Sequence, residues 1–320
     1  MIFFYFFILT VTTGQGHNQT ASALKDEVTK RGHEAEILDV LEHISSTLKA
    51  SVSKGYLFST SISPRAYGKF YRVAEKKDPD GIIDLEKLAN SRKVTEYINS
   101  AMPDVIICTH VIAAFTFKKA NLNYGIVKTA GIITDFTIHP YWNETSLDYY
   151  ILPNEKLCYQ GRAKGLSGEL LPFGIPIMPV FSSKRDKTEV RKELGIPDKK
   201  TVLCMSGSMG YGKVYKNIFR LNSMNGDFQI ISVCGNNEDL KRKIDRKNFK
   251  KIAINYGFTK NVPLLMDAAD IIITKPGGIT VSEALSKELP IIIANPIPGH
   301  EERNCEFLLN SGVALKATET

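Results

Sequence analysis

Apolar, strand-like runs alternate along this chain with stretches whose apolar residues recur at helical spacing. The strand-like runs cover 2–12, 35–40, 104–109, 127–134 and 148–152 in the first half, and 201–206, 227–233, 251–256, 270–274 and 290–294 in the second. Helical patterns lie between them, among others at 18–31, 90–101, 212–222, 278–288 and 301–310. This alternation predicts an α/β fold with parallel sheets and right-handed crossovers.

The pattern stops once and starts again. The segment LLPFGIPIMPVF at 170–181 contains three prolines and one glycine, which cannot continue a regular element. A length of 320 residues suits two domains at ~150 residues each. We therefore predict two doubly wound, Rossmann-like domains, 1–171 and 182–320, joined by a linker at 172–181. Because ligands bind at the carboxyl ends of parallel strands, we expect the domains to face each other across a ligand-binding cleft.

The N-terminal run MIFFYFFILTV could be mistaken for a membrane segment. It is far shorter than the ~20 residues that a spanning helix needs, and it lacks the basic flank of a signal peptide. A buried parallel strand suits it better. Five cysteines lie far apart with no C-x-x-C pair, so neither a disulfide framework nor a zinc site is indicated. These features predict a reduced, cytoplasmic compartment.

The net charge of +7 is unevenly distributed. The basic stretch at 241–251 is typical of a solvated helix face, and we expect no nucleic-acid partner. The stretch 43–74 has no acidic residue, and aromatic side chains alternate with basic ones. This mixture favours an anionic lipid surface and predicts a peripheral protein on the inner face of the cell membrane. Its basic and aromatic residues are Lys49, Lys54, Arg65, Lys69, Arg72, Tyr56, Phe58, Tyr67, Phe70 and Tyr71.

Two polar segments follow strands of the first half. In TTGQGH at 12–17, Gly14 and Gly16 allow a tight turn and His17 can exchange a proton, although a plain strand-to-helix turn is the alternative. The segment lacks the third glycine of a dinucleotide fingerprint and the Gly-Lys-Ser/Thr of a phosphate-binding loop. In GIITDFTIHPYW at 131–142, Asp135 ends a strand as a cleft carboxylate or a cap. His139 either caps or packs, and Trp142 either fills the core or lies beside lipid.

Three segments follow strands of the second half. The small residues of CMSGSMGYGK at 204–213 leave backbone N–H groups available for a diphosphate. In ITKPGGITVSEAL at 273–285, Gly277 and Gly278 uncover the amides of a helix N-terminus, which favours a phosphate. Thr280 adds a hydroxyl, and Glu283 lies within the first two turns. NPIPGHEERN at 295–304 then supplies a histidine and two carboxylates, either for sugar hydroxyls or as a solvated helix start.

Together, TTGQGHNQTASAL, TDFTIHPYW, GIPIMPVF, ITKPGGITVSEAL and the later EERN resemble the processive diacylglycerol glucosyltransferases and monogalactosyldiacylglycerol synthases. These enzymes share the GT-B fold with the N-acetylglucosaminyltransferase of peptidoglycan synthesis. The resemblance implies inverting transfer of a hexose from UDP-glucose or UDP-galactose to diacylglycerol, with UDP-sugar as co-substrate and with neither a catalytic metal nor a cofactor. Family members continue beyond the strand-like GVALKA, which implies a truncated C-terminal domain.

The resemblance also assigns residues. It places His17 and Asp135 at the acceptor side of the cleft, and because the attacking hydroxyl must lose a proton, either is a candidate base. On the acceptor or membrane side we count Gly14, Gly16, His139, Trp142, Tyr56, Phe58 and Arg65. On the donor side it places Ser208, Gly210, Tyr256, Gly257, Phe258, Gly277, Gly278, Ile279, Thr280, His300, Glu301 and Glu302. We add Glu283 to the donor side from its position in the helix. Gln15 stands where many members have a third glycine, and His300 stands where members have Gln, which leaves glucose or galactose open.

Two other classes of function remain open on the sequence. A UDP-sugar 2-epimerase of the same fold would bind the donor but would not need the basic and aromatic stretch at 43–74. A non-catalytic UDP-sugar sensor would keep the donor site but not the candidate bases. The DPD triplet at 78–80 is spelled like the Asp-x-Asp of metal-dependent transferases, but it lies in a polar stretch without a preceding strand and indicates a turn.

Overall fold

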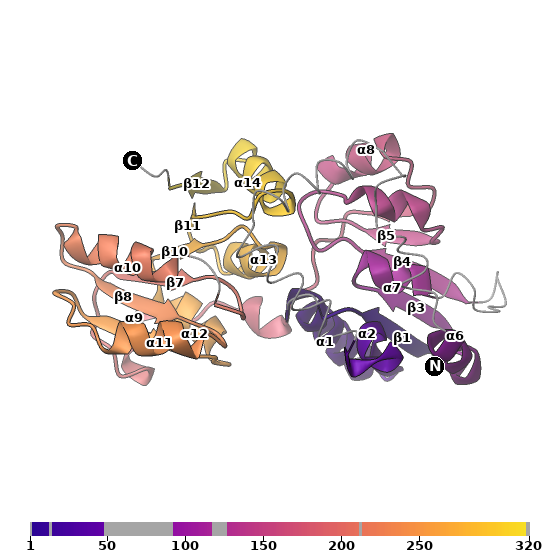
Figure 1. Cartoon of the computed structure of the whole chain (residues 1–320), viewed down its shortest axis with the longest axis horizontal. Helices are drawn as coiled ribbons and strands as arrows, with labels where there is room; N and C mark the ends of the chain where they lie inside the picture. Colours follow the sequence, from indigo (N-terminus) through magenta and orange to yellow (C-terminus); the bar gives the residue numbers. More distant parts are fainter. Residues whose placement is uncertain (1, 13–14, 48–91, 117–126, 211–212, 318–320) are drawn as a thin grey trace. The chain divides into compact units, whose positions relative to one another are not determined.

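The computed structural model describes residues 2–12, 15–47, 92–116, 127–210 and 213–317. The chain divides into an N-terminal unit, Met1–Met178 with Pro298–His300, and a C-terminal unit, Pro179–Ile297 with Glu301–Thr320. The division at Met178 falls within the stretch 172–181. Each unit contains one six-stranded sheet whose strand pairs are all parallel, with helices packed on it (Figure 1). The predicted α/β fold with parallel sheets is confirmed.

The sheet of the N-terminal unit has the strand order β2-β1-β3-β4-β5-β6. Its strands are β1 (Tyr5–Thr10), β2 (Glu34–Asp39), β3 (Val105–Cys108), β4 (Lys128–Ile132), β5 (Tyr149–Ile151) and β6 (Glu169–Leu171). Its helices are α1 (Gln15–Lys30), α2 (Val40–Ile44), α6 (Arg92–Ala101), α7 (Val111–Thr116), the 3-10 helix η2 (Pro140–Glu144) and α8 (Lys156–Ala163). Ile8, Ile107 and Ile132 of three adjacent strands pack with Ala21 of α1 in one core cluster. Apolar burial between sheet and helix is what fixes this arrangement.

The first strand is shorter than its apolar run. Phe7, Ile8 and Leu9 are fully buried in β1, as expected for a central parallel strand. Ile2 and Phe3 precede the strand and are exposed. Within the described residues, no helix has the length and apolarity that crossing a membrane requires.

The sixth strand was not predicted. Residues 170–171 belong to the proline-rich stretch by sequence, yet they pair with β5 as the end of β6. Gly168 makes this possible, because a Cβ there would lie 2.3 Å from the Leu147 carbonyl oxygen. The close approach lets the Glu169 N–H donate to the Asp148 carbonyl at 2.8 Å. Regular pairing ends at Pro172, as the prolines predict.

The sheet of the C-terminal unit has the order β12-β11-β10-β7-β8-β9. Its strands are β7 (Thr201–Met205), β8 (Gln229–Val233), β9 (Ala253–Tyr256), β10 (Ile271–Thr274), β11 (Ile291–Ile293) and β12 (Ala314–Lys316). Its helices are the 3-10 helix η3 (Pro179–Phe181), α9 (Lys187–Glu193), α10 (Val214–Ser223), α11 (Glu238–Asp245), α12 (Val262–Ala268), α13 (Gly278–Ser286) and α14 (His300–Asn310). Ile218 of α10 and Ile230 of β8 are fully buried in its core.

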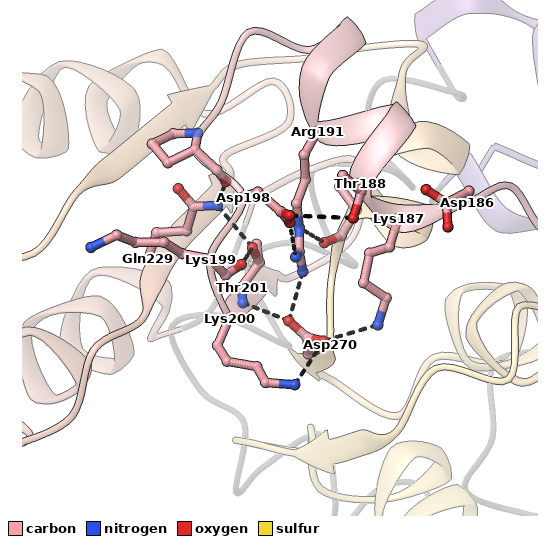
Figure 2. Close-up of polar contacts among 12 residues, drawn as sticks. Asp186, Lys187, Thr188, Arg191, Asp198, Lys199, Lys200, Thr201, Gln229 and Asp270 are labelled. Carbon is pink, nitrogen blue, oxygen red and sulfur yellow. Dashed lines mark hydrogen bonds and ion pairs between the residues drawn. The ribbon is translucent and has the colours of Figure 1, made fainter.

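Ion pairs fasten the amino edge of this sheet (Figure 2). The Arg191 guanidinium, 7% exposed, contacts Asp198 at 2.8 Å and Asp270 at 2.7 Å. Asp270 also accepts from Lys187 Nζ at 2.9 Å and from the Thr201 N–H at 2.8 Å. Burial alone would raise the pKa of Asp270, but these hydrogen bonds outweigh it and the pKa is lowered. The ionised carboxylate therefore holds α9 against the starts of β7 and β10.

The residues just after the division are bonded to the end of α13. Ser286 Oγ donates to the Phe181 carbonyl at 3.0 Å, and Lys287 Nζ donates to the Ser183 carbonyl. Lys287 also pairs with Asp267 at 2.8 Å, and both side chains are almost fully buried. Breaking such a buried pair leaves an uncompensated charge, so this anchor is sensitive to single substitutions.

Candidate functional site

In the N-terminal unit, polar side chains gather where strands end. His17 lies in the first turn of α1, which follows β1. Thr109 and His110 follow β3, and Thr134 and Asp135 follow β4. The order of strands makes β1, β3 and β4 neighbours, so these residues from distant parts of the sequence meet at one edge.

The histidine is held in one orientation. His17 Nδ1 lies 2.7 Å from the Thr109 carbonyl oxygen and 3.2 Å from Thr134 Oγ1. Because a carbonyl only accepts, the Nδ1–H donates to it, and Nε2 keeps the lone pair that can accept a proton. Desolvation lowers the pKa of His17, and the charge of Asp135 opposes this effect. His17 is therefore neutral at pH 7 and able to act as a base, and a carboxylate favours the imidazolium that would form.

A second histidine lies against the first, which sequence reasoning missed. The rings of His17 and His110 are edge to face with centroids 4.6 Å apart. His110 Nδ1 accepts from the Ile112 N–H at 3.0 Å, and desolvation lowers the pKa of His110 well below its usual value. A neutral His110 adds no positive charge beside His17. Its position directly after a strand, in the run CTH, was the available signal.

A chain of hydrogen bonds fixes the start of α1 on the sheet. Thr109 Oγ1 donates to Thr10 Oγ1 at 3.0 Å, and Thr10 donates to Asn18 Oδ1 at 2.9 Å. Asn18 Nδ2 donates to Thr12 Oγ1 at 2.8 Å, and Thr12 donates to Asp39. The network crosses the ends of three strands and includes the residue next to His17. A connected network of satisfied hydrogen bonds rigidifies the backbone that carries it.

The other predicted residues of this unit have different positions. His139 is the N-cap of η2 and accepts from the Tyr141 N–H at 3.2 Å, and desolvation with nearby Lys164 lowers its pKa to about 4. Trp142 is 5% exposed, and its ring fills the space beside Gly131, so of its two predicted roles the structure shows the core one. Gly16 lies in the first turn of α1. Gly14, Tyr56, Phe58 and Arg65 fall outside the described residues.

In the C-terminal unit, the turn after β10 presents backbone rather than side chains. Gly277 is the N-cap of α13 with φ −71° and ψ 134° and contributes no side-chain cap. A Cβ built on Gly277 would meet nothing within 4 Å, so the space before the helix is open. Gly278 and Ile279 are buried, and Thr280 is half-buried in the first turn. Uncapped amides at a helix start, with the positive end of the helix dipole, are suited to a phosphate.

One carboxyl group on this helix, that of Glu283, has no polar partner among the residues that the structure describes. Glu283 is 5% exposed, and none of the described residues donates a hydrogen bond or pairs an ion with its side chain. Desolvation raises its pKa to about 8. A buried carboxylate is unfavourable in its charged form unless hydrogen-bond donors satisfy it, so this group stays protonated at pH 7 until donors approach it. Glu283 therefore marks a place for hydrogen-bond donors one turn and a half into α13.

Side chains of helix α14 are hydrogen-bonded to the turn that precedes α13. Glu301 is 4% exposed, and its oxygens accept from Lys275 Nζ at 3.1 Å and from the Ile297 N–H at 2.7 Å. Asn304 Nδ2 donates to the Pro276 carbonyl at 2.9 Å. The carboxylate of Glu301 thus joins two loops, and its predicted contact with sugar hydroxyls stays a prediction. His300 and Glu302 are half-buried in the first turn of α14.

The loop after β7 contains the other predicted donor residues. Ser208 is half-buried, and Gly210 is buried with a φ of +61° that favours glycine. Phe258, beyond the end of β9, is 58% exposed and available for stacking. In the part of the chain that the structure describes, no group of three His, Cys, Asp or Glu side chains is arranged to hold a metal ion.

Comparison with known proteins agrees with both halves of the chain. The model of the monogalactosyldiacylglycerol synthase family matches residues 17–177, and the C-terminal domain model of glycosyltransferase family 28 matches residues 201–320. A processive diacylglycerol β-glucosyltransferase of Bacillus pumilus is 30% identical over 316 residues, which cover 96% of this chain and 82% of that relative.

Solved structures show the same fold. MurG of Acinetobacter baumannii matches with a TM-score of 0.60 at 13% identity, over 98% of this chain and 85% of that one. Anabaena Alr3699/HepE in complex with UDP-glucose matches with a TM-score of 0.55 at 14% identity, over 98% and 85%. At such identities the likeness shows the fold alone, which is GT-B. From the family models and the Bacillus relative, the chain belongs to the monogalactosyldiacylglycerol synthase family of GT-B glycosyltransferases.

Proposed function

We propose that this protein transfers a hexose, glucose or galactose, from a UDP-sugar to the free hydroxyl of diacylglycerol. The name of the Bacillus relative supports the lipid acceptor, and the UDP-glucose complex of the Anabaena neighbour supports the donor. The observation that carries the proposal is Glu283, a buried carboxylate without a partner among the described residues, on a helix whose amino end is open.

The donor would lie along the start of α13. Its diphosphate would accept from the amides uncovered at Gly277 and Gly278, next to the Thr280 hydroxyl. The vicinal hydroxyls of its ribose or hexose would donate to Glu283. Such hydroxyls satisfy a carboxylate that desolvation otherwise keeps largely protonated at pH 7. A single ligand would thereby bind both to the uncapped amides of the helix and to the carboxylate of Glu283.

The acceptor would react beside His17. The diacylglycerol hydroxyl gives its proton to His17 Nε2 while its oxygen bonds to the anomeric carbon, and Asp135 stabilises the resulting imidazolium. The bond from that carbon to the diphosphate breaks, and UDP leaves with the electron pair. Attack opposite the leaving group inverts the anomeric centre. The helix amides stabilise the charge that develops on the diphosphate, so the proposed step uses neither metal nor cofactor.

The acceptor also requires contact with a bilayer. Diacylglycerol is insoluble in water, so the enzyme would dock on the membrane as a peripheral protein. The stretch 43–74, most of which lies outside the described residues, combines positive charge with aromatic rings and no acidic residue. We propose that it binds anionic lipids on the cytoplasmic face.

Labelled UDP-glucose and UDP-galactose, each incubated with the purified protein and diacylglycerol vesicles, test the proposal. Separation of the lipids should show labelled glycolipid with one of the two donors. Formation of an epimeric UDP-sugar without a lipid product would favour an epimerase. Tight UDP binding without any turnover would favour a sensor, and absence of UDP binding would remove the donor site itself.

A further inference from the structure

The loop after β7, which contains Ser208 and Gly210, is interlocked with the loop after β8, residues 234–237. A Cβ on Gly210 would lie 1.8 Å from the Cys234 carbonyl oxygen, and a Cβ on Gly235 would lie 2.1 Å from the Ser208 carbonyl oxygen. Both glycines have positive φ, +61° and +56°. Each loop therefore occupies the space that a side chain on the other would need.

Polar bonds join the same two loops. The Asn236 N–H donates to the Ser208 carbonyl at 2.8 Å. Asn237 uses both ends of its amide: Nδ2 donates to the Gly210 carbonyl at 3.1 Å, and Oδ1 accepts from the Leu240 N–H at 2.9 Å as the N-cap of α11. The Asn237 side chain thus connects the loop after β7 to the start of α11, the helix that follows the neighbouring strand β8.

We propose that Asn237 is a positioning residue for donor binding, which sets the geometry of the diphosphate loop at Ser208–Gly210 without touching the donor. The inference rests on the proposed function, because it takes this loop as part of the UDP site. Backbone N–H groups bind a phosphate only where their directions converge, and a small, glycine-rich loop does not fix those directions by itself. The side-chain amide of Asn237 and the two glycines supply the missing constraint.

The nature of the anchor makes a clean variant available. Asn237→Asp keeps an oxygen for the Leu240 N–H, so α11 stays capped, but it replaces the Nδ2 donor with an oxygen that faces the Gly210 carbonyl. Asn237→Ser also caps a helix and adds no charge, but its side chain is too short to bridge the loops. Asn222→Asp is the matched control, because Asn222 Oδ1 accepts from the Lys251 N–H at 3.1 Å near the start of β9, at the other edge of the sheet.

Calorimetric titration with UDP, and ligand-observed NMR with uridine, test the inference. We expect both Asn237 variants to bind UDP about tenfold more weakly than the parent, with uridine affinity and thermal unfolding unchanged, since uridine has no phosphates. Asn222→Asp should bind both ligands as the parent does. Parental UDP affinity in both Asn237 variants, or an equal loss for uridine, would overturn the inference while leaving the donor site in place. A parent that binds no UDP would overturn the proposed function and this inference together.

Discussion

The carboxyl edges of the two sheets present different chemical groups, ionisable side chains in one unit and backbone amides in the other. At the edge of the N-terminal unit, His17, His110 and Asp135 present ionisable side chains, and the backbone serves to orient them. At the edge of the C-terminal unit, the turn at Gly277 and the loop at Gly210 present backbone, and side chains such as Asn304 and Asn237 serve to orient it. Proton transfer needs a group whose pKa can be tuned, whereas binding a diphosphate needs several fixed N–H donors. Two parallel sheets with different strand orders thus present different groups through the residues placed after their strands.

Removing the ionisable group should have the largest effect on turnover. We expect His17→Ala to lower turnover by about a hundredfold or more, because the acceptor hydroxyl loses its base, while UDP affinity stays at the parental value. Steady-state rates with vesicle-bound diacylglycerol and titration with UDP measure the two quantities. Asp135→Asn, which keeps the shape and removes the charge, should cost less. Near-parental turnover in both variants would show that the base is neither His17 nor Asp135.

The pH profile of turnover should report the same residue. Because desolvation lowers the pKa of His17, the fraction of neutral base stays high at pH 7 and falls only below pH 6.5. We therefore expect the acid limb of kcat/KM below pH 6.5 in the parent. In Asp135→Asn the loss of the stabilising charge lowers the pKa further, which should move that limb to more acidic pH. A limb that does not move would separate Asp135 from His17.

Filling the open turn should have the next largest effect, and on binding rather than turnover. Gly277 has an ordinary φ and free space around a Cβ, so Gly277→Val should fold normally while its side chain occupies the approach to the helix amides. We expect UDP affinity to fall by about tenfold to a hundredfold. Uridine binding and thermal unfolding serve as controls. Undiminished UDP affinity in a folded variant would show that the diphosphate lies elsewhere.

The pH dependence of UDP affinity should report the protonation of Glu283. Its pKa of about 8 in the free protein should fall when donor hydroxyls bind, so binding releases a proton and parental UDP affinity should rise between pH 6 and pH 8. Glu283→Gln should flatten this rise, as titrations at several pH values would show. The free energy of unfolding should change with pH in the opposite direction. Because the pKa of Glu283 is higher in the folded protein than in the unfolded chain, its contribution to stability is complete below pH 4.5 and is lost as the pH rises through 8. The Gln variant should therefore unfold at higher temperature than the parent at pH 8, but not at pH 4.5.

The most salt-dependent effect concerns the membrane. Changing Lys49, Lys54, Arg65, Lys69 and Arg72 to Ser removes about 1 kcal/mol of attraction per charge near an anionic surface, weakened by salt. Sedimentation with anionic vesicles should fall more than it does after the same treatment of the basic residues in 241–251. The reverse order would mean that the C-terminal unit carries the lipid-binding surface.

Much of this molecule could be predicted because its signals are local. Parallel strands such as β8 are buried continuously and read as apolar runs, and the segments after them have the small or polar residues that a site needs. β6 was missed because its pairing depends on the close approach of Gly168 to another strand, which sequence spacing does not encode. The two hydrogen bonds of the Glu301 carboxylate were not predicted for a related reason. Its partners Lys275 and Ile297 lie in two loops, and a motif indicates that a residue is near a site but not which of its atoms are already bonded.

The bonds that join Phe181 and Ser183 to the end of α13 have a consequence for building chimeric glycosyltransferases. Although the proline-rich stretch runs to Phe181 by sequence, the residues after Met178 are bonded into the C-terminal unit through Ser286 and Lys287. A gene fusion that exchanges N-terminal halves between relatives should therefore be joined at Met178, because residues before it, such as Gly174, are bonded to the N-terminal unit. With a junction after Ser183, the residues that contact Lys287 would come from the other protein. The buried Lys287–Asp267 ion pair would then lie against a segment of different sequence.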